Sequence, residues 1–360
     1  MKEYIQELGL STADIVAITP QVIADTIEEI ARYKRVFGQF YKKNTDLMTS
    51  GGKAMEFPRK GSGITAIFST ATSGVTLSAS SMSYSAVTIT VGKGGVGLAI
   101  NGEAIRQANR DVLADAIQEA GDVWADTLDL LALETMFPSV TASATASTVT
   151  SIAACSLPIG FKSIIGTAGS LIIASPISSS LVFPLAGATI TMWYIPTTVA
   201  GQAIGCKQLA GQATSFTARD ILNLRGYIIG KTMSPSVILM HPDRLTEILY
   251  DATVKFLEKS AYEGQGPVYT GELGKIWGLN VIVSNKVPKY GIISIDPRYL
   301  GYEVWRKDMK MVRDDYTGMN QDELRFWGFA ELNYGITNAA AYGALAMGVG
   351  TYSFAVLTTN

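Results

Sequence analysis

The sequence is poor in charge, in histidine and in cysteine, and each shortage argues against a class of function. Only 17% of the 360 residues are charged and the formal net charge is −2, which argues against a nucleic-acid binder that works through clustered Lys and Arg. The single histidine, His241, has no second histidine for metal ligation or base catalysis. Two cysteines, Cys155 and Cys206, are too few for a disulfide scaffold or a cysteine-rich metal site. We therefore expect no catalytic residue, no metal site and no cofactor.

A membrane span and a signal peptide are not expected either. The longest candidate for a span, residues 170–195, is broken by Pro176, Pro184 and several serines. The start, from Met1 to Tyr4, lacks a basic segment followed by an apolar core. Apolar residues nevertheless make up 48% of the chain. A surface with so little charge suits a subunit of an assembly better than a protein alone in water.

What the sequence does contain is one very long amphipathic stretch, from Glu103 to Phe137, which Pro138 ends. At 1.5 Å per residue this helix would be roughly 50 Å long, whereas an average helix has about 11–12 residues. Apolar residues recur along one face at three- and four-residue steps: Ile105, Ala108, Val112, Leu113, Ala116, Ile117, Ala120, Trp124, Leu128 and Leu131. Such a strut suggests a part of a shell rather than a catalytic pocket.

The segment before this helix predicts a two-stranded arm. Residues 53–59 and 85–100 have the composition and alternation of strands, and residues 61–81 between them are rich in Gly, Ser, Thr and Ala. We interpret them as a long hairpin with a flexible tip. Because an isolated hairpin is marginal in water, this arm needs a neighbour to lie on.

Beyond the long helix, residues 139–206 carry only one charged residue, Lys162. Branched aliphatic residues alternate there with turn formers and predict several short strands. The other predicted elements begin with an extended arm over 1–18 and a helix that starts at Pro20 after the cap Thr19. Further helices are predicted over 216–230, with Thr217 as the cap, and over 244–256. A loop is predicted over 257–274, strands over 236–240, 279–284, 292–295, 302–313 and 323–336, and an apolar end over 339–358.

Three features invite a chemical interpretation, and a structural interpretation is favoured for each. His241 precedes Pro242 and Asp243 and is typical of the turn that opens a helix. The run from Gly92 to Gly97 superficially resembles a phosphate loop but lacks the Gly-Lys-Ser/Thr ending, so we interpret it as a hinge at the base of the arm. The acidic residues of the long helix lie off its apolar stripe and predict a solvated face.

Several segments, taken in order, resemble HK97-fold major capsid proteins of tailed viruses of bacteria or archaea. The resemblance covers most of the chain except residues 139–215. Its segments are Val87–Glu103, which leads into the long helix; Met240–Leu249, with His241 in place of the asparagine of an asparagine–proline turn; Gly274–Pro288; and 291–296, 302–311 and 324–329.

The resemblance implies an α+β fold, HK97-like, with a long spine helix, an extended β-hairpin loop, axial and peripheral domains and a β-rich insertion. Its implied parts are an N-terminal arm and helix (1–42), the extended loop (43–101), a peripheral domain with the spine helix (102–138 and 291–360), the insertion (139–215) and the axial domain (216–290).

The implied function is that of a major capsid protein, not an enzyme, which assembles with itself as pentamers and hexamers into an icosahedral shell around a viral double-stranded DNA genome. The implied partners are scaffold, portal and decoration proteins and non-specifically contacted DNA, with no membrane. The implied location is the virion, after assembly in the host cytoplasm. The nearest alternative is an encapsulin, a shell of the same fold around a protein cargo. A β-rich enzyme is the alternative of another class, against which the single histidine and the lack of a nucleophile motif argue.

Two further expectations about contacts between copies come with the resemblance. The loop 314–321 should gather at local three-fold axes, where charges of both signs could pair between copies: Arg313, Asp314, Asp315, Asp322, Glu323 and Arg325. Some relatives also join a lysine of the extended loop to an asparagine of the peripheral domain. The candidates here are Lys53, Lys60 and Lys93 with Asn333 and Asn338, but the tip 61–81 carries no lysine, so we expect no cross-links.

The insertion 139–215 is expected to form a small β-domain that stands on the axial domain and faces outward or touches its neighbours. Cys155 and Cys206 lie near its two ends. A disulfide between them would close a loop of about 50 residues and stabilise the fold by roughly 4 kcal/mol. Since assembly in a reducing cytosol would delay that bond until release, two free buried thiols are the alternative.

Overall fold

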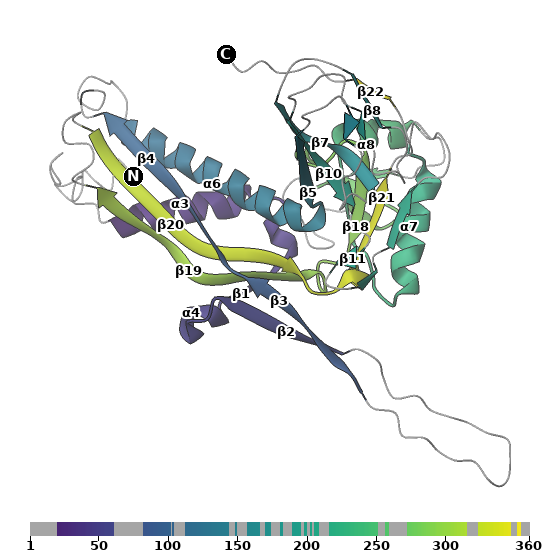
Figure 1. Cartoon of the computed structure of the whole chain (residues 1–360), viewed down its shortest axis with the longest axis horizontal. Helices are drawn as coiled ribbons and strands as arrows, with labels where there is room; N and C mark the ends of the chain where they lie inside the picture. The colour runs from purple at the N-terminus through teal and green to yellow at the C-terminus, as the bar shows by residue number, and fades with distance from the viewer. Residues whose placement is uncertain are drawn as a thin grey trace, which may run out of the picture.

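The computed structural model describes residues 20–60, 82–101, 103, 112–143, 148–149, 157–165, 170–173, 181–182, 189–195, 198–199, 202–203, 205–208, 216–250, 256–258, 272–314, 323–346 and 351–353. Its helices and strands form an elongated spine, a projecting arm, an axial part at one end of the spine and a small β-domain beside it (Figure 1). The α+β fold class predicted from the sequence is confirmed.

The spine is built on α6, which runs from Val112 to Met136 and has 25 residues. The predicted long helix is confirmed over this range, whereas residues 104–111 lie outside the described part. A second helix, α3 (Pro20–Lys34), packs along α6 and begins at the proline that the sequence marked as its first position. The two helices approach closely at Gly121, where an added Cβ would lie 2.7 Å from Cγ2 of Ile30. Any side chain at this position would push the helices apart.

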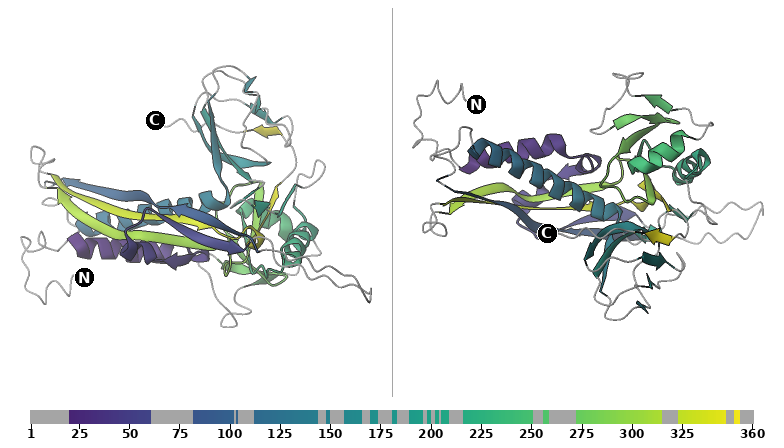
Figure 2. Two further views of the ribbon diagram at one scale, coloured as in Figure 1. Left: turned by 60° about the horizontal axis from the view of Figure 1, so that its bottom comes forward. Right: turned by 90° about the horizontal axis from the view of Figure 1, so that it is seen from above.

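Both helices lie on one face of a four-stranded sheet (Figure 2). Its order is β1 (Lys42–Asn44), β19 (Gly301–Asp314), β20 (Glu323–Ile336) and β4 (Gly92–Asn101), with β1 parallel to β19 and the other pairs antiparallel. Alternate residues of β20, such as Phe326 and Ala330, are buried in the core that includes the helices, while Trp327 and Phe329 between them are exposed. The two-residue period of a strand thus gives the sheet one covered and one open face.

The arm consists of β2 (Ala54–Lys60) and β3 (Tyr84–Thr90), paired antiparallel as predicted. The prediction of a single strand over 85–100 was wrong, because the chain changes partner at Val91 and continues as β4 beside β20. The prediction of a hinge at Gly92–Gly97 was wrong for the same reason, since these glycines are part of a regular strand. At Gly97 an added Cβ would lie 2.6 Å from the indole of Trp327, so a close side-chain contact, not a need for flexibility, explains that glycine.

The axial part is a seven-stranded sheet, flanked by α7 (Ala218–Gly230) and α8 (Pro242–Leu249). Thr217 precedes α7 as predicted, and its hydroxyl donates to Asp220 at 2.6 Å. The loop predicted over 257–274 is bounded by two strands of this sheet. The strand order is β13 (Gly205–Gln208), β21 (Tyr342–Ala346), β18 (Gly291–Ile295), β14 (Val237–Met240), β17 (Leu279–Val283), β16 (Glu272–Ile276) and β15 (Phe256–Glu258).

This sheet does not follow the implied division into domains. Two of its strands, β18 and β21, come from the range assigned to the peripheral domain, and β13 comes from the range assigned to the insertion. All five residues of β18 and all five of β21 are buried, so they serve as interior strands of the axial core. We therefore propose an axial domain that includes residues 205–208, 291–295 and 342–346.

The insertion is rich in strands, as predicted. Figure 2 shows it projecting on the side of the spine sheet away from α3. One sheet has the order β5 (Ser139–Ser143), β10 (Thr189–Ile195), β7 (Leu157–Ile165), and a pair joins β11 (Thr198–Val199) to β12 (Gln202–Ala203). Another has the order β22 (Thr351–Ser353), β8 (Ser170–Ile173), β9 (Leu181–Val182), β6 (Thr148–Val149). Because β22 belongs to the C-terminal tail, residues 351–353 lie with the insertion and not with the peripheral domain.

A buried carboxylate connects the parts of the spine. Asp129 of α6 is fully buried and accepts hydrogen bonds from the backbone N–H groups of Val36 at 2.9 Å and Phe37 at 2.9 Å. Nζ of Lys286, in the loop between β17 and β18, lies 3.4 Å from the same carboxylate and 2.6 Å from that of Asp126. One side chain therefore joins the spine helix, the chain after α3 and the axial part.

The turn at His241 opens α8, as predicted. Its Nδ1 accepts a hydrogen bond from the backbone N–H of Asp243 at 3.2 Å, so this nitrogen must be unprotonated. Burial lowers the pKa of His241 below its ordinary value, with Lys289 and Arg244 acting in the same direction and Asp243 opposing them. Neutral His241 therefore contributes stability that is present above its unfolded pKa of about 6.5 and is lost as the pH falls through that value toward the folded pKa.

We expect Asp129→Ala to lower the free energy of unfolding by about 3 kcal/mol, because it leaves the N–H groups of Val36 and Phe37 without their acceptor and leaves Lys286 with only the exposed carboxylate of Asp126. The matched control is Asp126→Ala, whose carboxylate binds the same lysine but is 71% exposed; it should cost less than about 1 kcal/mol. Urea unfolding of the unassembled subunit, followed by tryptophan fluorescence, measures both. Equal losses would contradict the role of Asp129.

We expect His241→Asn to keep the helix cap, since an amide oxygen can accept the same hydrogen bond, and to lose the acid sensitivity that His241 supplies. His241→Ala should lose the cap and cost about 1 kcal/mol at pH 7.5. Thermal unfolding of both variants and the wild type between pH 7.5 and 5 isolates the effect. The same pH dependence in the wild type and in the asparagine variant would show that His241 does not titrate with folding.

Candidate assembly surfaces

In the part of the arm that the structure describes, the contacts with the body of the subunit lie at its base. Ile89 and Val91 form a small buried cluster with Leu47 and Val304, and the rings of Phe57 and Tyr302 stack with centroids 4.4 Å apart. Farther along, Ala86 and Thr88 of β3 are exposed, and 68% of the surface of Tyr84 is accessible. The described part of the arm thus has a fixed root and an exposed outer half, as expected for an element that lies on a neighbour.

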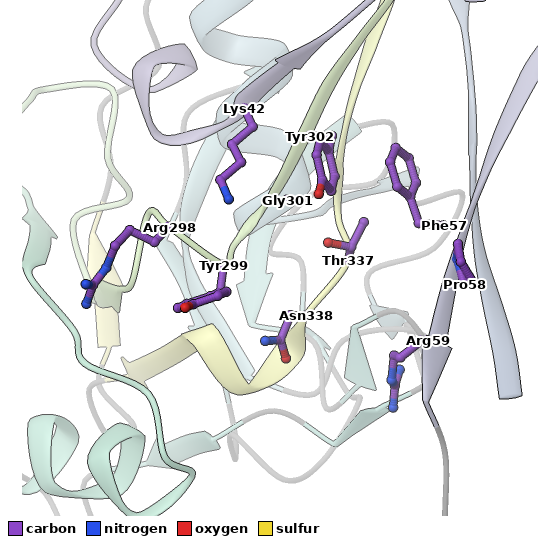
Figure 3. A pocket seen from close by; sticks show the side chains of 10 residues that line it. All are labelled: Lys42, Phe57, Pro58, Arg59, Arg298, Tyr299, Gly301, Tyr302, Thr337 and Asn338. Carbon is purple, nitrogen blue, oxygen red and sulfur yellow. The ribbon is translucent and has the colours of Figure 1, made fainter. Parts of the chain in front are cut away.

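A hollow of about 630 Å³ lies between the arm and the body of the subunit (Figure 3). It is lined by three cationic side chains and no acidic one. Nζ of Lys42 lies 5.8 Å from the ring centroid of Tyr299, and Nε of Arg298 lies 3.3 Å from the buried carboxylate of Asp296. The lining residues are Lys42, Phe57, Pro58, Arg59, Arg298, Tyr299, Gly301, Tyr302, Thr337 and Asn338. They come from three segments far apart in the sequence, so sequence reasoning had no local signal for this hollow.

A buried polar cluster fixes the root of the spine sheet. Nη1 of Arg35 lies 2.6 Å from Oε1 of Glu303, and the hydroxyl of Tyr334 donates to the same oxygen at 3.0 Å. Burial, followed by the negative charge of Glu303, raises the pKa of Tyr334 well above its ordinary value. The tyrosine therefore stays a hydrogen-bond donor at all physiological pH values. This cluster holds the chain after α3 against β19 and β20, next to the strands that support the arm.

Of the residues predicted at the three-fold loop, the structure places Asp314, Glu323 and Arg325 next to one another. Asp314 and Arg325 are paired across the ends of β19 and β20, and Oε2 of Glu323 lies 2.6 Å from Nη2 of Arg325. Arg313 stands opposite Phe326 in the same ladder. Asp315 and Asp322 lie outside the described residues. Arg325 therefore has an acidic partner within its own subunit. From the sequence, we expected Arg325 to pair with an acidic residue of another copy.

Three of the candidate cross-linking residues, Lys93, Asn333 and Asn338, make contacts within their own subunit. Lys93 and Asn333 line one groove beside α6, but Nζ of Lys93 lies 4.1 Å from the ring centroid of Phe329, and the amide of Asn333 donates to the carbonyl of Thr90 at 2.7 Å. Asn338 caps the short helix at Ala339–Ala341. Lys53 is exposed and Lys60 ends β2. The absence of cross-links between copies stays a prediction.

Only one of the two cysteines belongs to the described part of the chain. Cys206 lies on β13, opposite Ala344 of β21, whereas Cys155 lies outside the described residues. Their redox state stays a prediction.

Within the described residues, no group of three His, Cys, Asp or Glu side chains could hold a metal ion. Over the same part of the chain, no helix is both long and apolar enough to cross a membrane.

Comparisons with known proteins identify the fold. The sequence matches no protein-family model and no curated protein. Among solved structures, a chain of the capsid of cyanophage P-SCSP1u is 13% identical, with a TM-score of 0.53 over 88% of this chain and 89% of that chain. A chain of the mature capsid of bacteriophage PhiM1 is 11% identical, with a TM-score of 0.50 over 88% of this chain and 87% of that one.

A third match, a chain from Mycobacterium phage Bobi, is 12% identical, with a TM-score of 0.51 over 87% of this chain and 91% of that chain. At such identities the likeness is one of fold, and it covers 87–88% of this chain. The resemblance noted in the sequence is thereby confirmed at the level of architecture: the chain has the HK97-like fold of phage major capsid proteins.

Proposed function

We propose that this protein is the major capsid subunit of a tailed virus of bacteria or archaea, and that pentamers and hexamers of it close into a shell around double-stranded DNA. The observation that carries the proposal is the match of nearly the whole chain to phage capsid structures. The neutral composition and the anchored arm support it, because both leave surfaces that only other copies can cover.

The proposed mechanism is geometric. The arm of one subunit lies on the next and gains the packing partner that a two-stranded ribbon lacks alone. The axial parts meet at the five- and six-fold axes, while the ends of β19 and β20 meet at local three-fold axes. The β-rich insertion faces outward or touches its neighbours. Scaffold, portal and decoration proteins are the proposed partners, the DNA is contacted non-specifically, and assembly takes place in the host cytoplasm before the subunit becomes part of the virion.

The contents of purified particles separate this function from that of an encapsulin. Particles of a capsid protein, isolated from cells that produce the virus, should contain nuclease-protected double-stranded DNA of one defined length. Particles that instead enclose a folded protein cargo and no DNA would assign the chain to the encapsulin alternative.

We expect Arg325→Glu to abolish assembly while leaving the subunit folded. The reversal places a third acidic side chain beside Glu323 and Asp314, where three copies would bring nine together. Arg325→Lys keeps the charge and should still form shells. Sedimentation and negative-stain microscopy of both variants, with circular dichroism as the test of folding, measure the outcome. Normal shells from the glutamate variant would contradict the proposed three-fold contact.

A further inference from the structure

Four strand edges of the spine and arm have no partner strand among the described residues, and two of them belong to the stretch 84–101. The first is the outer edge of β4, the last strand in the order of the spine sheet. The second is the outer edge of β3, which is paired on one side only, with β2. An open edge presents a row of N–H and C=O groups that can pair with another chain.

The edge of β4 has few of the features that usually prevent such pairing. Its ten residues pair with β20 in an unbroken register, without a bulge. It contains no proline and only one charged residue, Lys93. Beside its first residues lies a groove of about 310 Å³, lined by Gly92 and Gly94 and by apolar side chains of α6 that include Leu130 and Leu131. An incoming strand would find both backbone partners and apolar cover there.

The hydrogen-bond pattern shows which groups of β3 face its open edge. The N–H of Val91 donates to the carbonyl of Lys53 at 3.0 Å. In an antiparallel ladder, pairs that exchange hydrogen bonds alternate with pairs that do not, so Ala86 and Thr88 are in positions that do not bond to β2. Pro58, which has no N–H, stands opposite Ala86 in agreement with this assignment. The N–H and C=O groups of Ala86 and Thr88 therefore point to the open edge.

The two strands of the arm differ in how their edges are protected. The sequence of β2 carries Glu56, Pro58, Arg59 and Lys60, which are typical of an edge that resists pairing. The sequence of β3, Tyr-Ser-Ala-Val-Thr-Ile-Thr, has no charge and no proline. Only one edge of the arm is suited to strand addition, and it is the edge of β3.

The open edges of β3 and β4 are opposite edges of one continuous stretch of chain. The N–H of Val91 points to β2, whereas the carbonyl of Thr90 accepts a hydrogen bond from the side chain of Asn333 on β20. Thus β2 and β20 lie on opposite sides of the stretch 84–101. Because of this, the open edge of β3 in one copy can meet the open edge of β4 in a second copy. Such a head-to-tail contact forms a closed ring when the rotation from copy to copy closes.

We propose that β3 of one copy adds to the edge of β4 in the next copy, so that the arm of each subunit extends the four-stranded spine sheet of its neighbour, with β3 as the fifth strand and β2 as the sixth. This inference rests on the proposed function and specifies the surface on which the arm lies. The recognition is by backbone hydrogen bonds, with the apolar groove beside α6 covering side chains of the added strand. A ring of such contacts would be one continuous intermolecular sheet.

Proline substitution on β3 tests this pairing. Thr88→Pro and Ala86→Pro each remove an N–H group from the open edge without removing a hydrogen bond to β2. We expect each to lower the yield of shells at least tenfold. Thr88→Val keeps the N–H and should assemble like the wild type. Normal shells from both proline variants would overturn the proposal.

Hydrogen exchange of the wild-type protein gives a second measurement that does not depend on how the variants fold. Mass spectrometry should show exchange at least tenfold slower in both segments 84–90 and 92–101 in shells than in unassembled subunits. Shells in which both segments exchange as in free subunits would overturn the strand pairing and leave the proposed function intact. A wild-type protein that forms no shell under any assembly condition would instead overturn the proposed function, and this inference with it.

Discussion

A two-stranded ribbon has no interior, and this constraint shapes the rest of the molecule. Over its described residues, the arm buries apolar side chains only where Ile89 and Val91 meet Val304 at its root. Beyond that root it exposes both faces, and isolated ribbons of this kind are marginal in water. Its stability must come from a surface that the subunit does not itself provide, so the folded subunit is complete only within an assembly.

The rest of the spine makes the root of this arm rigid. Two helices cover one face of the spine sheet, and Asp129 joins α6 both to the chain after α3 and, through Lys286, to the axial part. The cluster of Arg35, Glu303 and Tyr334 holds the strands against which the arm starts. Asp129, Glu303 and Tyr334 are buried and hydrogen-bonded, so displacing any of them would leave buried polar groups without partners. A rigid root fixes the direction of the arm, and therefore the geometry of any contact between copies.

Local patterns in the sequence predicted the elements whose own side chains determine them. The helical spacing predicted α6, and the alternation along 302–313 and 323–336 predicted β19 and β20 to within one residue at each end. The caps at Thr217 and His241 were identified correctly, because a cap is specified by a few neighbouring residues. The resemblance to capsid proteins added the global arrangement, which no single segment carries.

What could not be predicted depends on partners far away in the chain. The alternation along residues 85–100 gives no sign that the partner strand changes from β2 to β20 at Val91. The composition of the chain's end does not reveal that β21 enters the axial sheet while β22 joins the insertion, since a strand of three to five residues carries no signal for its partner. Arg325 was expected to pair between copies, but its nearest acidic partner lies two positions away on the same strand.

Copies of this chain are proposed to build a closed shell in which each arm lies on a neighbouring subunit. Electron cryo-microscopy of the purified, assembled protein tests it most directly. The account predicts icosahedral or related particles with five- and six-fold capsomers, in which residues 84–90 of each subunit contact the next subunit. A protein that stays monomeric under every assembly condition, or a shell in which the arm folds back on its own subunit, would contradict it.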